Sequence, residues 1–111
     1  MRPEDRIRVL HMLEAAEAVA GFISGRDRAS LDADRMLSFA LARAVEILGE
    51  AASGISPETR STAPTVPWGR ITAMRNRLIH AYFDIDRDIL WKTAAEEIPT
   101  LSPLLRKMLE G

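Results

Sequence analysis

The spacing of apolar residues constrains the fold most, because it follows a helical period along almost the whole chain. Near the start, Val9, Leu13, Ala16 and Ala20 recur at intervals of three and four residues, so they share one face of a helix. We find no stretch with the alternation of apolar and polar residues that marks a half-buried strand. The sequence therefore predicts an all-α protein.

The first two long helices have recognisable ends. The first is predicted over residues 3–23, and Gly25 shortly afterwards favours its termination. The second is predicted over residues 31–52, with Ser30 or Asp32 as its N-cap. A second apolar set on this helix, consisting of Met36, Ala40 and Ile47, predicts that it packs against more than one neighbour.

The second half of the chain contains a connection and two further helices. Residues 53–67 hold three prolines, and within them Ser56 and Pro57 predict a single helical turn. Pro67 can start the third long helix. Asp84 or Asp86 is the predicted N-cap of the last helix, which is expected to bend around Pro99 and Pro103.

These elements predict one antiparallel bundle of four to five helices. A chain of 111 residues with 47% hydrophobic residues can bury a single core but is too short for two ordinary domains. We therefore expect residues 1–111 to form one domain.

Composition excludes several kinds of chemistry. The chain has no cysteine, so it cannot form a disulfide or use a thiolate. His11 and His80 are the two histidines, and the carboxylates near them do not have the spacing of a zinc site. We expect neither a metal nor another cofactor. No run approaches the roughly 18 apolar residues that a membrane span requires, so we expect a cytoplasmic protein.

Positive charge is concentrated in one segment. The chain has a net charge of -1, yet no acidic residue lies between Glu58 and Asp84. This segment carries four arginines, namely Arg60, Arg70, Arg75 and Arg77. It therefore has a charge of +4, which leaves -5 for the rest of the chain. Such asymmetry is compatible with a small anion-binding site, although a chance gap in the acidic residues would look the same.

Residues 74–83, MRNRLIHAYF, place several polar groups within this segment. On a regular helix of about 100° per residue, Asn76 and His80 are neighbours and Arg75 nearly eclipses Tyr82, but Arg75 and His80 lie about 140° apart. Three arrangements could still bring Arg75 and His80 together. The helix could end or distort near His80, the long Arg75 side chain could reach around it, or a second copy of the chain could complete the site.

The residue types suit one reaction in particular. Imidazole exchanges protons near neutral pH, and a guanidinium can form two hydrogen bonds with a phosphate and stabilise its charge. RNA supplies its own nucleophile, the 2′-hydroxyl, so His80 and Arg75 would suffice to cleave it without a metal. On spacing alone, a histidine near a helix end is more often structural, and arginines there also complement the helix dipole. His11 lies opposite the apolar face of its helix and is predicted to be an exposed polar residue.

The sequence resembles the HepT toxins, small all-helical proteins of the HEPN superfamily of ribonucleases. Arg75, His80 and Tyr82 match the R-x-x-x-x-H-x-Y signature of that family, and the polar Asn76 after the arginine matches as well. The resemblance extends to LGEAA at residues 48–52, to PWGRITAMRNRLIHAYFDID at 67–86 and to a tryptophan in the last helix.

The resemblance implies a HEPN-like fold and a homodimer with RNA-cleaving sites in a cleft between the two copies. Arg75 and His80 would be catalytic, with Asn76 and Arg77 supporting the site or binding RNA. The resemblance also implies a type VII-like toxin-antitoxin system, in which an MntA-type nucleotidyltransferase antitoxin transfers AMP from ATP to Tyr82. Two alternatives stay open: a non-catalytic dimeric module that docks the nucleotidyltransferase and accepts AMP, and a purely structural bundle.

Overall fold

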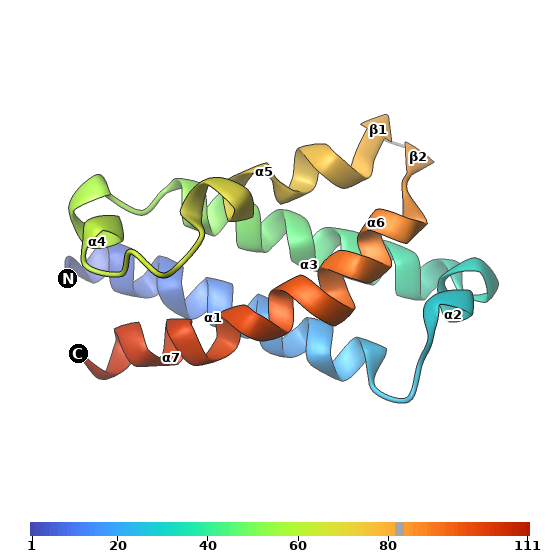
Figure 1. The fold of residues 1–111 in the computed structure, drawn as a ribbon, viewed down its shortest axis with the longest axis horizontal. Coiled ribbons are helices and arrows are strands. Elements are labelled where there is room, and N and C mark those ends of the chain that lie inside the picture. Colours follow the sequence, from blue (N-terminus) through green and yellow to red (C-terminus); the bar gives the residue numbers. More distant parts are fainter. Residues whose placement is uncertain (82–83) are drawn as a thin grey trace.

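Four long helical segments form the body of the molecule and run antiparallel to their neighbours (Figure 1). The computed structural model describes residues 1–81 and 84–111, and for residues 79–81 it describes the backbone alone. The all-α class is confirmed, with one short two-stranded ribbon added to the helices. Both termini lie at one end of the bundle, and the ribbon lies at the other (Figure 1).

Helices α1 (Pro3–Ile23) and α3 (Arg35–Ser53) form the central pair. The predicted span of the first helix is confirmed, and Gly25 follows it with a φ of 72°, a left-handed conformation that glycine adopts at little cost. The two helices contribute the largest share of the core. Their fully buried apolar residues are Val9, Met12, Ala16, Val19, Leu41, Val45, Leu48 and Ala52.

The predicted second helix is in fact two helices, so its single span of residues 31–52 was wrong. Helix α2 (Arg28–Ala33) ends before Asp34, and α3 begins immediately after it. Asp27 caps α2 by accepting a hydrogen bond from the Ser30 N–H at 3.1 Å. Asp34 caps α3 by accepting one from the Leu37 N–H, also at 3.1 Å. Because Asp34 caps a new helix from an extended conformation, Ser30 and Asp32 are not the N-caps.

Helix α5 (Trp68–Leu78) lies against α3 and is shorter than the sequence predicted. It starts after Pro67 as expected, and Ser56 caps the predicted single turn, α4 (Pro57–Ser61). The expectation that the third helix continues through His80 was wrong. The chain becomes extended at strand β1 (Ile79–Ala81), because the Leu78 carbonyl accepts a hydrogen bond from the Asp86 N–H at 2.7 Å instead of from the next helical turn.

The last segment is one rod of four consecutive helical pieces. Strand β2 (Asp84–Ile85) pairs antiparallel with β1 and leads into α6 (Arg87–Lys92), which Asp86 caps. A π-helical turn (Thr93–Glu97) and a 3-10 turn (Ile98–Thr100) follow, and then α7 (Leu101–Glu110) returns along α1. Of the two prolines expected to bend this helix, Pro99 lies in the 3-10 turn and has no N–H to continue the helical ladder, whereas Pro103 lies within α7.

Candidate active site

The site residues predicted from the sequence lie at the end of α5 and in the ribbon that follows it. Arg75 and Asn76 are exposed on the last turn of α5, whereas Arg77 is half-buried. His80 lies in β1, and its side chain is outside the described part of the structure. Tyr82 lies outside the described residues altogether.

The break after Leu78 changes the geometry of the Arg75 and His80 pair. The separation of about 140° holds for a regular helix only, and the helix ends at Leu78, so His80 is the second residue of strand β1. The helix thus ends near His80, as in the first of the three arrangements considered from the sequence, while the position of the His80 side chain relative to Arg75 lies outside the described part of the structure. The predicted near eclipse of Arg75 and Tyr82 also assumed a regular helix through residue 82, whereas α5 ends at Leu78.

Arg75 is paired only loosely with α3. Its Nε lies 3.8 Å from Oε2 of Glu46, which is an ion-pair distance and too long for a hydrogen bond. The other Glu46 oxygen accepts a hydrogen bond from Arg43 Nη1 at 2.6 Å. The Arg75 side chain is 54% exposed. A partly exposed ion pair of this kind is weak, so a phosphate can compete for the Arg75 guanidinium.

The other three arginines of the acid-free segment are engaged in the fold. Arg60 donates to the carbonyl oxygens of Ile55 and Ala52 at 3.1 and 2.9 Å. Arg70 and Arg77 both donate to Glu97. Within the described part of the chain, Arg75 is thus the arginine of this segment that keeps its guanidinium most available for an anion.

Glu97 and Glu46 are two residues of the site that sequence reasoning missed. Glu97 lies on the π-helical turn, with its side chain 13% exposed. Burial alone would raise the pKa of its carboxyl, but hydrogen bonds from Arg77 and Arg70 outweigh burial and lower the pKa below its ordinary value. No local motif signals their contacts with α5, because Glu97 and Glu46 meet Arg77 and Arg75 from different helical segments.

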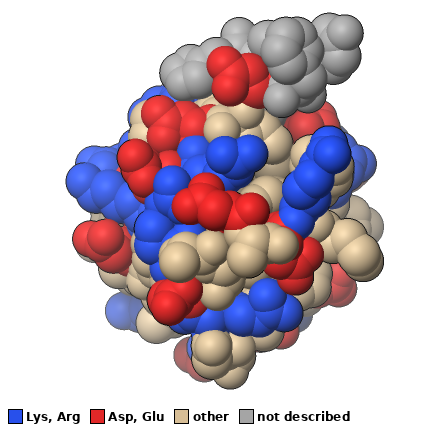
Figure 2. All heavy atoms as spheres, turned by 90° about the vertical axis from the view of Figure 1, so that its right-hand side faces the viewer, with Lys and Arg blue, Asp and Glu red and all other residues tan. Residues whose placement is uncertain are grey.

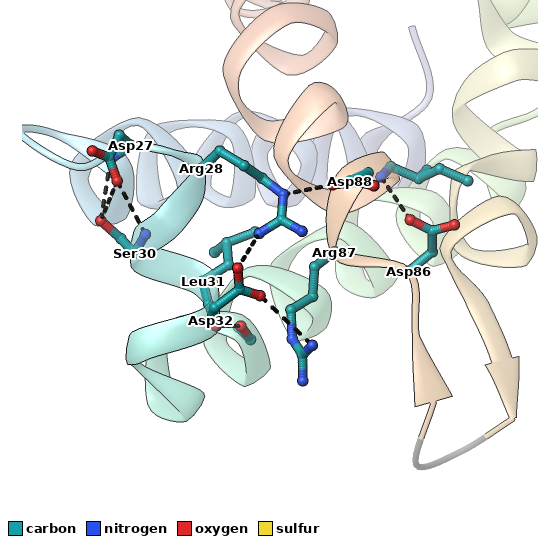
Figure 3. Close-up of polar contacts among 10 residues, drawn as sticks. Asp27, Arg28, Ser30, Leu31, Asp32, Asp86, Arg87 and Asp88 are labelled. Atoms are coloured by element: carbon teal, nitrogen blue, oxygen red, sulfur yellow. Dashed lines mark hydrogen bonds and ion pairs between the residues drawn. The ribbon is translucent and has the colours of Figure 1, made fainter.

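A network of charged side chains fixes the return of the ribbon into α6 (Figure 3). Asp86 accepts a hydrogen bond from the Ile89 N–H at 3.0 Å. Arg28 on α2 donates from Nε to Asp88 at 2.7 Å and from Nη1 to Asp32 at 3.1 Å. Arg87 approaches the same Asp32 at 3.7 Å. These contacts hold α2 against the start of α6, beside the strand that carries His80.

The end of the molecule that carries the ribbon bears charges of both signs. Figure 2 shows basic and acidic side chains intermixed below the residues drawn in grey. The ion pairs of Arg26 with Asp34 and of Arg28 with Asp32 account for part of this pattern. The described surface in this view shows no continuous basic patch.

An apolar face runs along α1 and α3, away from the core. Its exposed side chains include Ile7, Leu10, Phe22, Met36 and Phe39, of which Met36 is 81% exposed. A groove between the two helices is lined by His11, Glu14, Ala15, Ala18, Phe22, Ala40, Arg43, Ala44 and Ile47. The second apolar set predicted from the sequence contributes to this face, and His11 is exposed there as expected. We call this surface the α1–α3 face.

The described residues show neither a metal cluster nor a membrane-spanning helix. In this part of the chain, no group of three or more histidine, aspartate or glutamate side chains is placed to hold a metal ion. A bilayer requires a helix with roughly 18 or more apolar residues, and the described helices contain no such stretch.

Comparison with known proteins decides the family. Residues 12–108 match the family described as Ribonuclease HepT-like. The chain belongs to the HepT-like ribonuclease family. A protein of Thermococcus cleftensis named "Probable ribonuclease HepT" is 43% identical to this HepT-like chain over 75 residues, which are 68% of each protein. A protein of Methanocaldococcus jannaschii named "Putative RNase" is 39% identical over 90 residues, which are 81% of this chain and 83% of the relative.

A third relative covers the HepT-like chain more fully. A "Putative RNase" of Caldanaerobacter subterraneus is 34% identical over 100 residues, which are 90% of this chain and 89% of the relative. No solved structure matches the chain significantly. The family assignment therefore rests on sequence similarity over most of the chain, and it agrees with the all-α bundle described above.

Proposed function

We propose that this HepT-like ribonuclease cleaves RNA without a metal, with Arg75 as the phosphate-binding residue and His80 as the general acid-base. The observation that carries the proposal is the availability of Arg75. It keeps only a 3.8 Å ion pair on the last turn of α5, while Arg60, Arg70 and Arg77 are hydrogen-bonded within the fold. Its position on the last turn of α5, which leads into the strand that contains His80, supports a shared site.

The chemistry requires only these two groups and the substrate. The neutral imidazole of His80 takes the proton of a ribose 2′-hydroxyl, whose oxygen attacks the adjacent phosphorus. The bond to the 5′-oxygen breaks, and a protonated imidazole returns a proton to that departing oxygen. Arg75 stabilises the negative charge that builds on the non-bridging oxygens. The exposed Asn76 can donate a hydrogen bond to the same phosphate.

A second copy of the chain is the occupant that we propose for the α1–α3 face. Exposed apolar groups of this size on two adjacent helices are typical of an interface rather than of a solvated surface. Arg43 lines the groove on this face and shares Glu46 with Arg75. A dimer formed through this face would therefore place the Arg75 site at the edge of the interface.

The toxin-antitoxin role is a further part of the proposal and is supported by the signature of Arg75, His80 and Tyr82 together with the family. An MntA-type nucleotidyltransferase would transfer AMP from ATP to the Tyr82 hydroxyl in the cytoplasm. The AMP group would add bulk and negative charge two residues after His80 in the sequence and so compete with the substrate phosphate. Mass spectrometry after incubation with the antitoxin, ATP and Mg²⁺ should show the adduct on Tyr82. Tyr82→Phe should carry none and should stay active.

The decisive test of the ribonuclease proposal is cleavage of RNA by the purified protein in EDTA. His80→Ala and Arg75→Ala should each lower the rate by a factor of about 10² to 10⁴, since each removes a group that acts on the reacting phosphate. Arg106→Ala is the matched control, because Arg106 is an exposed arginine on α7 that pairs with Glu17. Circular dichroism should show the same helix content for all three variants.

Cleavage in EDTA, combined with the test for AMP on Tyr82, also distinguishes the ribonuclease from the alternative, a non-catalytic module that docks the nucleotidyltransferase. A wild-type protein that leaves RNA intact in EDTA, yet accepts AMP on Tyr82, would support docking without catalysis. Wild-type cleavage that persists in both alanine variants would contradict the assignment of Arg75 and His80.

A further inference from the structure

Glu97 binds two arginines of α5 with a single carboxylate. Arg70 donates to its Oε1 from Nε at 2.8 Å and also from Nη2. Arg77 donates from Nη1 to Oε1 at 3.4 Å and from Nη2 to Oε2 at 3.2 Å. The carboxylate thus receives four N–H groups, in a place where its side chain is 13% exposed.

These contacts fix one face of α5 along most of its length. Arg70 and Arg77 are seven residues apart, so they lie about two turns apart on the same face of the helix. Arg70 belongs to the first turn of α5, whereas Arg77 is the residue before Leu78, where the helix ends. Their common partner stands on the π-helical turn, a type of helical irregularity that is frequent at functional sites.

The position of Arg77 connects Glu97 to the strand that carries His80. Leu78 follows Arg77, and its carbonyl oxygen accepts the Asp86 N–H where β1 leaves the helix. Any rotation of the last turn of α5 would move both the Leu78 carbonyl and the direction in which β1 departs. Glu97 resists that rotation through Nη1 and Nη2 of Arg77. The buried Nε of the same guanidinium has no hydrogen-bond partner among the described residues.

Glu97 also determines which arginines of α5 have a carboxylate at hydrogen-bond distance. By neutralising Arg70 and Arg77, it leaves the exposed Arg75 as the cation that an incoming phosphate meets next to β1. Without Glu97, two more guanidinium groups on the same helix could attract phosphates to places where no acid-base group stands.

We infer that Glu97 is a positioning residue of the RNA-cleaving site: through Arg77 it fixes the end of α5 from which the His80 strand departs, and through both arginines it directs the substrate phosphate to Arg75. The inference rests on the proposed function for its catalytic part. Its structural part, the fixing of the helix end, can be measured without any activity.

The kinetic test compares Glu97→Gln with Glu96→Gln, because Glu96 is the exposed neighbour with the same charge. Glu97→Gln should lower kcat by about tenfold to 10²-fold, since misplacing a catalytic group by about 1 Å has an effect of this size. KM should stay constant or fall, because the released arginines still attract RNA. The dependence of RNA binding on salt should become steeper, by about 0.7 for each arginine that newly contacts a phosphate of single-stranded RNA. Glu96→Gln should match the wild type in kcat, KM and salt dependence.

Two further variants separate positioning from a loss of folding. Glu97→Asp keeps the charge and should recover most of kcat. Arg77→Met should reproduce the kcat defect of Glu97→Gln, and the double variant should be little worse than either single one, because both substitutions break the same contact. Arg70→Met removes the other partner of Glu97, at the far end of α5, and should leave kcat within a few-fold of the wild type.

Amide hydrogen exchange provides the readout that does not depend on RNA. In Glu97→Gln the Asp86 amide should exchange faster, because its acceptor on Leu78 is no longer held in place, while the buried amides of α3 should stay protected. Faster exchange throughout the protein, unchanged exchange at Asp86, or a fall in kcat accompanied by a rise in KM would overturn the inference. A wild type that does not cleave RNA would overturn the proposed function, and the exchange at Asp86 would then still decide whether Glu97 fixes the helix end.

Discussion

At the residue scale, buried or half-buried carboxylates organise this protein, and each takes its hydrogen-bond donors from distant parts of the chain. Glu97 holds α5, and Asp5 holds the start of α1 against α4. Asp5 is 2% exposed and accepts hydrogen bonds from the Ser56 N–H, the Ser56 hydroxyl and the Thr59 hydroxyl. Such a carboxylate is stable only in its charged form, because all three groups donate to it.

The Asp5 contacts predict a specific loss of stability in acid. Hydrogen bonds from the Ser56 and Thr59 side chains lower the pKa of Asp5 from 3.8 to about 2. Because the pKa is lower in the folded state, the contribution of Asp5 to stability is complete above pH 3.8 and is lost as the pH falls towards 2. In Asp5→Asn, the amide cannot accept all three hydrogen bonds, so the variant should be less stable than the wild type near neutral pH.

Urea unfolding at a series of pH values checks this prediction. The difference in unfolding free energy between wild type and Asp5→Asn should shrink between pH 4 and pH 2, since the wild type loses its charged carboxylate there. A difference that stays constant over this range would mean that Asp5 stabilises the fold by some route other than its charged form.

At the scale of elements, the contact between α3 and α5 places Arg75 next to Glu46. Gly49 lies at this contact, where a Cβ atom would be 3.4 Å from the Ile71 carbonyl oxygen. The absence of a side chain at Gly49 allows the two helices to approach each other closely, as small residues do wherever helix backbones meet. The distance between the two helices in turn sets how far Arg75 stands from α3.

We predict that Gly49→Val lowers the free energy of unfolding by about 1–3 kcal/mol, because added atoms in a close-packed contact push α5 away from α3. Thermal unfolding should show the loss. Gly69→Val is the matched control: it lies on the first turn of α5, and a Cβ there meets no atom within 4 Å, so its melting temperature should stay close to that of the wild type. Equal destabilisation by both substitutions would show that valine itself disturbs the helices, and that the closeness of α3 and α5 is not the cause.

At the scale of the whole molecule, the bundle presents two surfaces of different character. The end that carries the ribbon has intermixed charges (Figure 2), while the α1–α3 face is apolar and grooved. Helix α1 serves both the core and this face, since Val9 and Met12 are buried while Ile7 and Leu10 are exposed. A helix with apolar residues on two sides is expected where a second partner covers the outer side.

The dimer proposed through this face predicts a molecular mass of about twice 12.3 kDa by light scattering. Phe39→Asp should yield the monomer mass, because it places a charge within the apolar α1–α3 face, where Phe39 is 56% exposed. Lys107→Asp, an exposed charge change on α7, should remain dimeric. A wild type with the mass of one chain would contradict the proposal.

Mixing the two inactive variants tests whether the copies share a site. After subunit exchange, Arg75→Ala combined with His80→Ala should recover part of the cleavage activity if one working site takes Arg75 and His80 from different chains. A mixture that stays inactive would indicate that each chain supplies its own pair, which the end of α5 at Leu78 permits.

The sequence by itself determined the class of fold and indicated the candidate site residues. Apolar spacing, proline and capping residues are local signals, so they predicted α1, the start of α5 after Pro67 and a cap at Asp84 or Asp86, of which Asp86 caps α6. The spacing could not place the end of α5, because a backbone hydrogen bond from Asp86 to Leu78 ends that helix. The break at Asp34 was missed for a related reason: α2 and α3 have compatible apolar patterns, and only the cap separates them.

Only the tertiary structure decided which arginine is available to a substrate. From the sequence, Arg60, Arg70, Arg75 and Arg77 form one basic segment without distinction. In the fold, Glu97 reaches Arg77 from 20 residues away, and Glu46 on α3 stands only loosely beside Arg75. Charge is a property of the residue, whereas its neutralisation depends on which helices pack together, and that is set by the packing of the whole bundle.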